Sequence, residues 1–131
     1  MSKIKSYPDI NQCKKLKEIL PLESADMYYF TIIRDYPYSQ GKIKTIAKIM
    51  DGSFSSNYDI PCWSLVALLN VIPKHIKDYN VLRIDISDNS FAIWYDEIGY
   101  GVNNDLPNIT MESAVDACYE MIIKLNELKM L

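Results

Sequence analysis

The sequence has a single histidine, His75, so any chemistry that uses an imidazole depends on this one residue. A nucleophile–base pair is defined by geometry, and its usual local signals are absent here. No G-x-S-x-G motif is present, and no cysteine lies near His75 in the sequence. His75 follows Pro73 at the end of an apolar stretch, where a histidine commonly contacts the last helix carbonyls. A structural role is therefore the favoured interpretation of His75.

Two adjacent carboxylates, Asp96 and Glu97, are the second candidates for chemistry. With the asparagines and Asp105 of the following segment they could bind a hard cation, but the spacing of a calcium-binding loop is absent. Loop carboxylates are ordinarily solvated. The enzymatic alternative that stays open is a small hydrolase that uses Asp96, Glu97 or His75, and it predicts a concave pocket with converging polar groups.

The three cysteines, Cys13, Cys62 and Cys118, lie far apart and form no C-x-x-C pair. A structural zinc site uses four Cys or His ligands, usually in two close pairs, so the sequence predicts no metal site. It also predicts no cofactor, because Gly99-Tyr100-Gly101 is not a phosphate-binding fingerprint. Each cysteine borders an apolar stretch, which predicts buried free thiols and a reducing, cytoplasmic location.

Aromatic residues are the unusual feature, with ten tyrosines in 131 residues. Tyr and Trp are enriched at protein interfaces because they combine a large apolar area with a polar group. The alternative is that many of these rings belong to the core. The candidate interaction surface consists of two groups, one before and one after the centre of the chain: Tyr36, Tyr38, Trp94, Tyr95 and Tyr100.

Charge is unevenly distributed along the chain. Residues 1–50 hold nine Lys and Arg against five Asp and Glu, whereas residues 51–131 hold five against twelve, so the halves carry +4 and −7 and sum to the net −3. Two differently charged faces explain this pattern; head-to-tail association or a basic patch that meets an acidic partner is the sharper interpretation. The acidic balance argues against nucleic acid. A single-strand binder through Lys42, Lys44 and Lys48 with the nearby tyrosines stays open.

The opening element is predicted as a helix over 10–20 that Asp9 or Asn11 caps and Pro21 ends. Residues 27–34 are rich in aromatic and β-branched residues and predict a strand. Residues 36–41 predict a turn and residues 51–59 a loop. Residues 42–49 are interpreted as a second strand that pairs with the first, although their spacing also fits a helix.

The stretch PCWSLVALLNVIP, residues 61–73, is almost wholly apolar. Proline suits the first turn of a helix, so the helix is expected to begin at Pro61 and to stop at Pro73. A helix that is apolar all round is buried on most sides. We therefore expect this segment to be the central core helix, with Trp63 shut away from solvent.

Residues 80–97 alternate strictly and predict a β-hairpin with a turn at 87–90. Leu82, Ile84 and Ile86 of the first strand and Phe91, Ile93 and Tyr95 of the second are expected on the face that packs against helices. The other face is expected to carry Arg83, Asp85 and Trp94. Residues 98–108 are predicted as a loop. The last helix is expected over 111–129, with Thr110 as its cap.

The segments IPCWSLVALLNVIP, IWYDEIGYGV and AVDACYEMIIKLNELKML resemble a group of small uncharacterised proteins encoded by phages, prophages and mobile elements of gut bacteria. The resemblance covers about the last seventy residues. It implies a phage or mobile-element role, but it transfers no catalytic residue.

The sequence thus predicts one globular α+β domain over residues 1–131, with the order α-β-β-α-β-β-α and a mainly antiparallel sheet that carries helices on one face. We expect a small non-enzymatic interaction protein that binds a protein partner or itself, for example as a dimer. The first residues lack an apolar signal segment, and no membrane association is expected.

Overall fold

A computed structural model describes residues 4–33, 43–49 and 60–131. The helices are α1 (Ile10–Ile19), α2 (Leu65–Val71) and α3 (Ala114–Glu127), and a 3-10 turn covers Leu22–Ser24. The strands are β1 (Met27–Ile33), β2 (Ile43–Ile49), β3 (Ile60–Cys62), β4 (His75–Ile76), β5 (Asn80–Ser87), β6 (Ser90–Glu97), β7 (Gly101–Val102) and β8 (Ile109–Met111).

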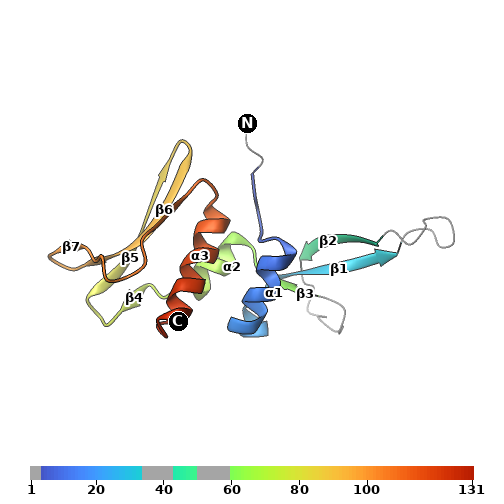
Figure 1. Ribbon diagram of the computed structural model, residues 1–131, viewed down its shortest axis with the longest axis horizontal. Helices are drawn as coiled ribbons and strands as arrows, with labels where there is room; N and C mark the ends of the chain where they lie inside the picture. The colour runs from blue at the N-terminus through green and yellow to red at the C-terminus, as the bar shows by residue number, and fades with distance from the viewer. Residues whose placement is uncertain (1–3, 34–42, 50–59) are drawn as a thin grey trace.

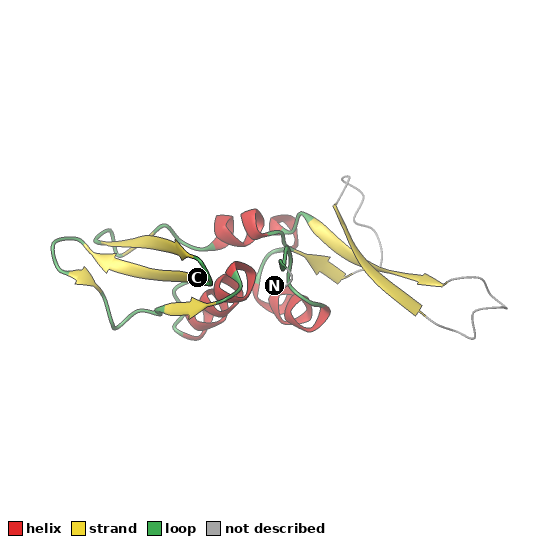
Figure 2. Cartoon of the chain, turned by 90° about the horizontal axis from the view of Figure 1, so that it is seen from above, coloured by secondary structure: helices red, strands yellow, loops and turns green. Residues whose placement is uncertain are grey.

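The strands form two antiparallel sheets at opposite ends of an elongated molecule, with the helices between them (Figure 1). The N-terminal sheet has the strand order β2-β1-β3. The C-terminal sheet has the order β4-β5-β6-β7, and β8 also pairs with β6. The view from above shows the same arrangement (Figure 2). The predicted α+β class with antiparallel strands is confirmed; the difference is that the strands form two sheets.

A continuous set of buried residues joins the two ends through the helices. Leu16 of α1, Leu68 of α2 and Met121 of α3 are each 0% exposed. Burying a large apolar side chain contributes about 1.5–3 kcal/mol, so the helical layer supplies much of the stabilisation. Because α3 packs against β6, β8 and α2, the C-terminal sheet is held to the core through β6 and β8.

Cys13 and Cys62 are both 0% exposed where α1 packs against β3, and the Cys13 thiol donates to the Pro8 carbonyl at 3.7 Å. Hydrogen bonding to the neighbouring Cys62 side chain, followed by burial, raises the pKa of Cys13 well above its usual value. Burial also raises the pKa of Cys118 to about 12, although the charge of Lys74 acts in the opposite direction. All three cysteines are buried and free, as the sequence predicted.

Helix α1 begins where predicted, because Asp9 caps it. The Asp9 carboxylate accepts from the Gln12 amide at 2.8 Å, and the Gln12 side chain accepts from the Asp9 amide at 3.0 Å. This reciprocal pair satisfies two N–H groups that the helix leaves unbonded.

Strand β1 and its pairing with β2 are also confirmed. Residues 43–49, for which the sequence fitted both a strand and a helix, therefore form a strand.

The predicted helix start at Pro61 is wrong. Pro61 lies in β3 opposite Tyr28, at a sheet edge where its missing N–H costs no ladder hydrogen bond. Helix α2 begins only after Ser64, whose hydroxyl accepts from the Ala67 amide at 3.3 Å. Trp63 is 0% exposed, as predicted, but it precedes the helix. Val66 is 67% exposed, so α2 is covered on part of its circumference only.

The predicted start of the last helix at residue 111 is also wrong. Residues 109–111 form β8, which pairs with β6, and Ser113 caps α3 by accepting from the Asp116 amide at 3.2 Å. Short strands such as β4, β7 and β8 were not predicted, because two or three residues show no readable alternation.

Candidate interaction surface

The inner face of the β5–β6 hairpin is covered on one strand and open on the other. On β6, Phe91 and Ile93 are 5% and 0% exposed. Their cross-strand partners on β5, Ile86 and Ile84, are 75% and 41% exposed. The prediction that this face packs against helices is therefore wrong for Ile84 and Ile86, whereas Leu82 is half-buried and packs against the core. The cause is the position of α3, which lies over β6 and β8, so β5 extends beyond the helical layer.

The outer edge of β5 is paired only at its beginning. Strand β4 pairs with Asn80 and Val81, and the Leu82 amide donates to the Lys74 carbonyl at 2.9 Å. From residue 83 to 87, no strand within the described part of the chain adjoins this edge. In Figure 1 this part of the hairpin, drawn in yellow, projects away from the helices.

The direction of the Leu82 amide shows which backbone groups this edge presents. Along an antiparallel strand, successive residues direct their N–H and C=O groups to opposite sides. Since the Leu82 amide points away from β6, the N–H and C=O groups of Ile84 and Ile86 point outward as well. Solvent or a partner strand must satisfy them. The same two residues carry the exposed apolar side chains.

A hollow of about 440 Å³ lies where β4 ends and the open edge begins. Leu69 of α2 and Leu82 and Ile84 of β5 line it with apolar side chains, and Lys74 and His75 also line it. The Lys74 ammonium donates to the Ile72 carbonyl at 2.8 Å and also to the Leu69 carbonyl, which fixes it at the end of α2. Partial burial lowers the pKa of Lys74. The hollow therefore extends the apolar surface of Ile84 toward α2.

The outer face of the hairpin is polar. Asp96 accepts from the Trp94 indole N–H at 2.8 Å, and Arg83 Nε lies 3.4 Å from its other oxygen. Asp85 and Asp88 are exposed and form no ion pair within the described residues. The open edge therefore combines an apolar inner face with free acidic groups near the hairpin tip.

The structure describes three of the five residues of the predicted aromatic surface. The assignment of Tyr95 to an exposed surface is wrong, because its side chain is 0% exposed and its hydroxyl donates to the Pro73 carbonyl at 2.6 Å. Adjacent strand residues point to opposite faces, so Tyr95 lies inward while Trp94, half-buried, lies outward. Tyr100 is 84% exposed in a turn between two glycines with positive φ. Tyr36 and Tyr38 lie outside the described residues.

The residues of the enzymatic alternative do not converge. Asp96 is held by Arg83 and Trp94, while Glu97, its neighbour on β6, lines a separate hollow of about 230 Å³. His75 is exposed on β4, and the hollow beside it contains no carboxylate among its lining residues. Within the described ranges, no group of three or more His, Cys, Asp or Glu side chains is placed to hold a metal ion.

The basic residues of the nucleic-acid alternative are only partly described. Lys48 on β2 is exposed, and its ammonium lies 4.8 Å from the centre of the Phe30 ring. Lys44 belongs to β2, and Lys42 lies outside the described residues. Of the helices in the described part of the chain, none has the length and apolarity to cross a membrane.

The open edge of β5 was missed by the sequence analysis. Strict alternation in residues 80–97 located the hairpin and both its faces, but the pairing of β8 with β6 decides which strand the helices cover.

Comparison with known proteins found no matching family model, no matching curated protein and no matching solved structure.

Proposed function

We propose that this protein is a small interaction module that binds a protein strand along the outer edge of β5. The single observation that supports the proposal is the coincidence of unpaired backbone groups and exposed apolar side chains at Ile84 and Ile86. Edge strands are normally protected by bulges, prolines or inward charges. Between Arg83 and Ser87 the edge has no proline, and its inner-face residues are apolar.

Strand addition fits this geometry. A partner strand would satisfy the backbone of Ile84 and Ile86, and its own inner side chains would cover these two residues. The hollow beside Leu69 and Leu82 offers a place for one further side chain. Main-chain hydrogen bonds would give affinity, and the hollow together with Asp85 would give specificity.

We therefore retain the expectation of a protein partner or self-association, but the surface proposed for binding is the edge of β5 instead of the tyrosines. A phage or mobile-element origin, which the resemblance implies, stays a prediction, and so does a cytoplasmic location. The exposed Tyr100, in the turn between β6 and β7, and the half-buried Trp94, on the outer face of β6, are not part of this surface.

Site-specific photo-crosslinking in the cells that carry the gene tests the proposal. A photoreactive phenylalanine analogue replaces Ile86 in one variant and Ile98 in a matched control, because both side chains are exposed. The proposal expects a protein adduct from position 86 that position 98 does not give and that Ile84→Asp abolishes. Equal adducts from both positions, or none from position 86, would contradict it.

A further inference from the structure

We propose that the strand received by β5 is the open edge of β2 from a second copy of this chain, so that copies associate head to tail. The inference rests on the proposed function, because it names the partner of the same edge. It is carried by the properties of the two edges, by their opposite charge and by their positions in the molecule.

Strand β2 is the second long open edge. It pairs with β1 along its whole length, from Ile43 opposite Ile33 to Ile49 opposite Met27. On its other side no strand adjoins it among the described residues. The remaining edge of the same sheet is β3, which has three residues and contains Pro61. Short strands with proline resist pairing, so β2 is the edge of this sheet that can accept a strand.

The two open edges carry opposite charge. Strand β2 contains Lys44 and Lys48 and belongs to the half of the chain with a balance of +4. On the β5 edge Arg83 is paired with Asp96, whereas Asp85 on the edge and Asp88 in the adjoining turn are exposed and have no ion-pair partner in the described ranges; this half of the chain carries −7. Lysines on an edge strand oppose pairing with an identical edge, but they favour an acidic one.

Pairing of β5 with its own copy is the competing arrangement, and the charges disfavour it. A two-fold antiparallel pairing that uses the whole open edge, residues 83–87, places Asp85 directly opposite Asp85 of the other copy. Like charges directly opposite each other destabilise a strand pair. A shift by one residue in each copy, centred on Ile84, brings Ile86 to the position beside Leu82 that Lys74 already occupies.

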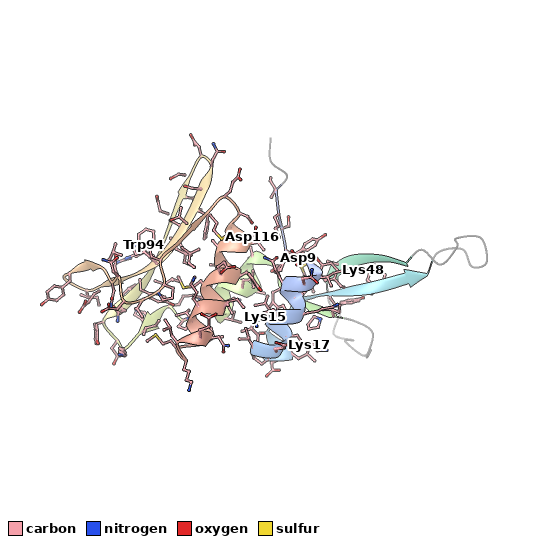
Figure 3. The ribbon with its side chains drawn as sticks, viewed as in Figure 1. Asp9, Lys15, Lys17, Lys48, Trp94 and Asp116 are labelled. Atoms are coloured by element: carbon pink, nitrogen blue, oxygen red, sulfur yellow. The ribbon has the colours of Figure 1, made fainter. Side chains whose placement is uncertain are left out.

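The positions of the edges decide the form of the assembly. Strand β2 and the β5–β6 hairpin lie at opposite ends of the molecule, with the helices between them (Figures 1 and 2). Figure 3 shows Trp94 on the β5–β6 hairpin and Lys48 on the other side of the helices. One copy therefore cannot join its own two edges. A contact between different surfaces produces an open chain of molecules, or a ring if the rotation closes.

Sedimentation velocity with one-sided variants tests the inference. Lys48→Glu disables the β2 edge, and Ile86→Asp disables the β5 edge; both side chains are exposed, so the fold should be retained, which circular dichroism and urea unfolding check. Ile98→Asp is the control for an exposed isoleucine. The wild-type protein should grow in size with concentration, and salt should weaken the association.

The decisive sample is a mixture of the two disabled variants. Each alone should bind itself at least about tenfold more weakly than the wild-type protein. An equimolar mixture should form a heterodimer and nothing larger, because one intact edge of each kind remains. A wild-type protein that stays monomeric at about 1 mM in low salt overturns the inference, and so does a homodimer that Lys48→Glu leaves intact. If either result is found while crosslinking at position 86 captures another protein, the proposed function stands without this partner.

Discussion

Ile84 and Ile93 face each other across the β5–β6 ladder, yet Ile93 is 0% exposed and Ile84 is 41% exposed. The two residues have the same side chain, the same strand geometry and the same sheet face. They differ because α3 packs on β6, while β5 lies beyond it. Ile93 therefore contributes to the stability of the protein, whereas Ile84 is available to bind a partner.

Truncation of the two isoleucines should therefore have opposite consequences. Ile93→Ala removes buried methyl groups and leaves a cavity, which should lower the free energy of unfolding by about 2–5 kcal/mol in urea titrations. Ile84→Ala should lower it by less than about 1 kcal/mol, but should weaken association at the β5 edge. Equal losses of stability would show that β5 is covered in solution.

Trp63 should behave as a core indole. Its N–H donates to the Ser24 hydroxyl at 2.9 Å, and its side chain is 0% exposed. With Trp94→Phe, Trp63 is the only tryptophan, and its fluorescence should resist quenching by acrylamide until the protein unfolds. Trp63→Ala should cost about 3–5 kcal/mol of stability. Free quenching of this indole in the folded protein would contradict the architecture.

The three thiols should be unreactive in the folded state. The thiolate is the reactive form, and burial raises the pKa of Cys118 to about 12. An aromatic disulfide reagent at neutral pH should modify these thiols at least about a hundredfold more slowly than free cysteine, through opening of the fold. In denaturant all three should react at once. Ile98→Cys supplies the positive control, because it adds one exposed thiol that should react rapidly.

The ion pair between Lys5 and Asp116 should stabilise the fold only while Asp116 is ionised. The Lys5 ammonium lies 2.7 Å from Asp116, and the Gln12 amide donates to the same oxygen at 3.0 Å. Burial by itself raises the pKa of Asp116, but hydrogen bonds from Lys5, Gln12 and Ser113 and the Lys5 charge outweigh it, so the pKa lies below its usual value.

A folded-state pKa below the unfolded value of about 3.9 means stabilisation that is complete above about pH 4–5. It is lost as pH falls through the folded-state pKa. Asp116→Asn should therefore lower stability by about 1 kcal/mol near neutral pH, with a difference from wild type that shrinks in acid. Asp88→Asn, at an exposed aspartate, is the matched control. A difference that grows on acidification would contradict this assignment.

Local chemistry made much of the fold predictable. Asp9 located the start of α1, alternation located the β5–β6 hairpin, and the apolar residues around Trp63 indicated a buried segment. These signals are local because caps, turns and strand alternation act over a few residues. The boundary at Pro61 failed because proline suits an edge strand as well as a first helical turn, and the cap at Ser64 decides between them.

The candidate site was not predictable in the same way. Nothing in the sequence distinguishes Ile84 from Ile93, since their exposure depends on where α3 lies and on the pairing of β8 with β6.

Tyr95 was assigned both to the packing face and to the interface. Its neighbour Trp94 points outward, and strand alternation alone excludes Tyr95 from the same surface.

Amide hydrogen exchange at β5 tests the central claim most directly. In dilute solution the amides of Ile84 and Ile86 should exchange rapidly, while those of Arg83 and Asp85, which bond to β6, stay protected. At concentrations where the protein associates, Ile84 and Ile86 should become protected as well. Protection of all four amides in the dilute monomer would contradict the claim, because it would mean that this edge is already occupied.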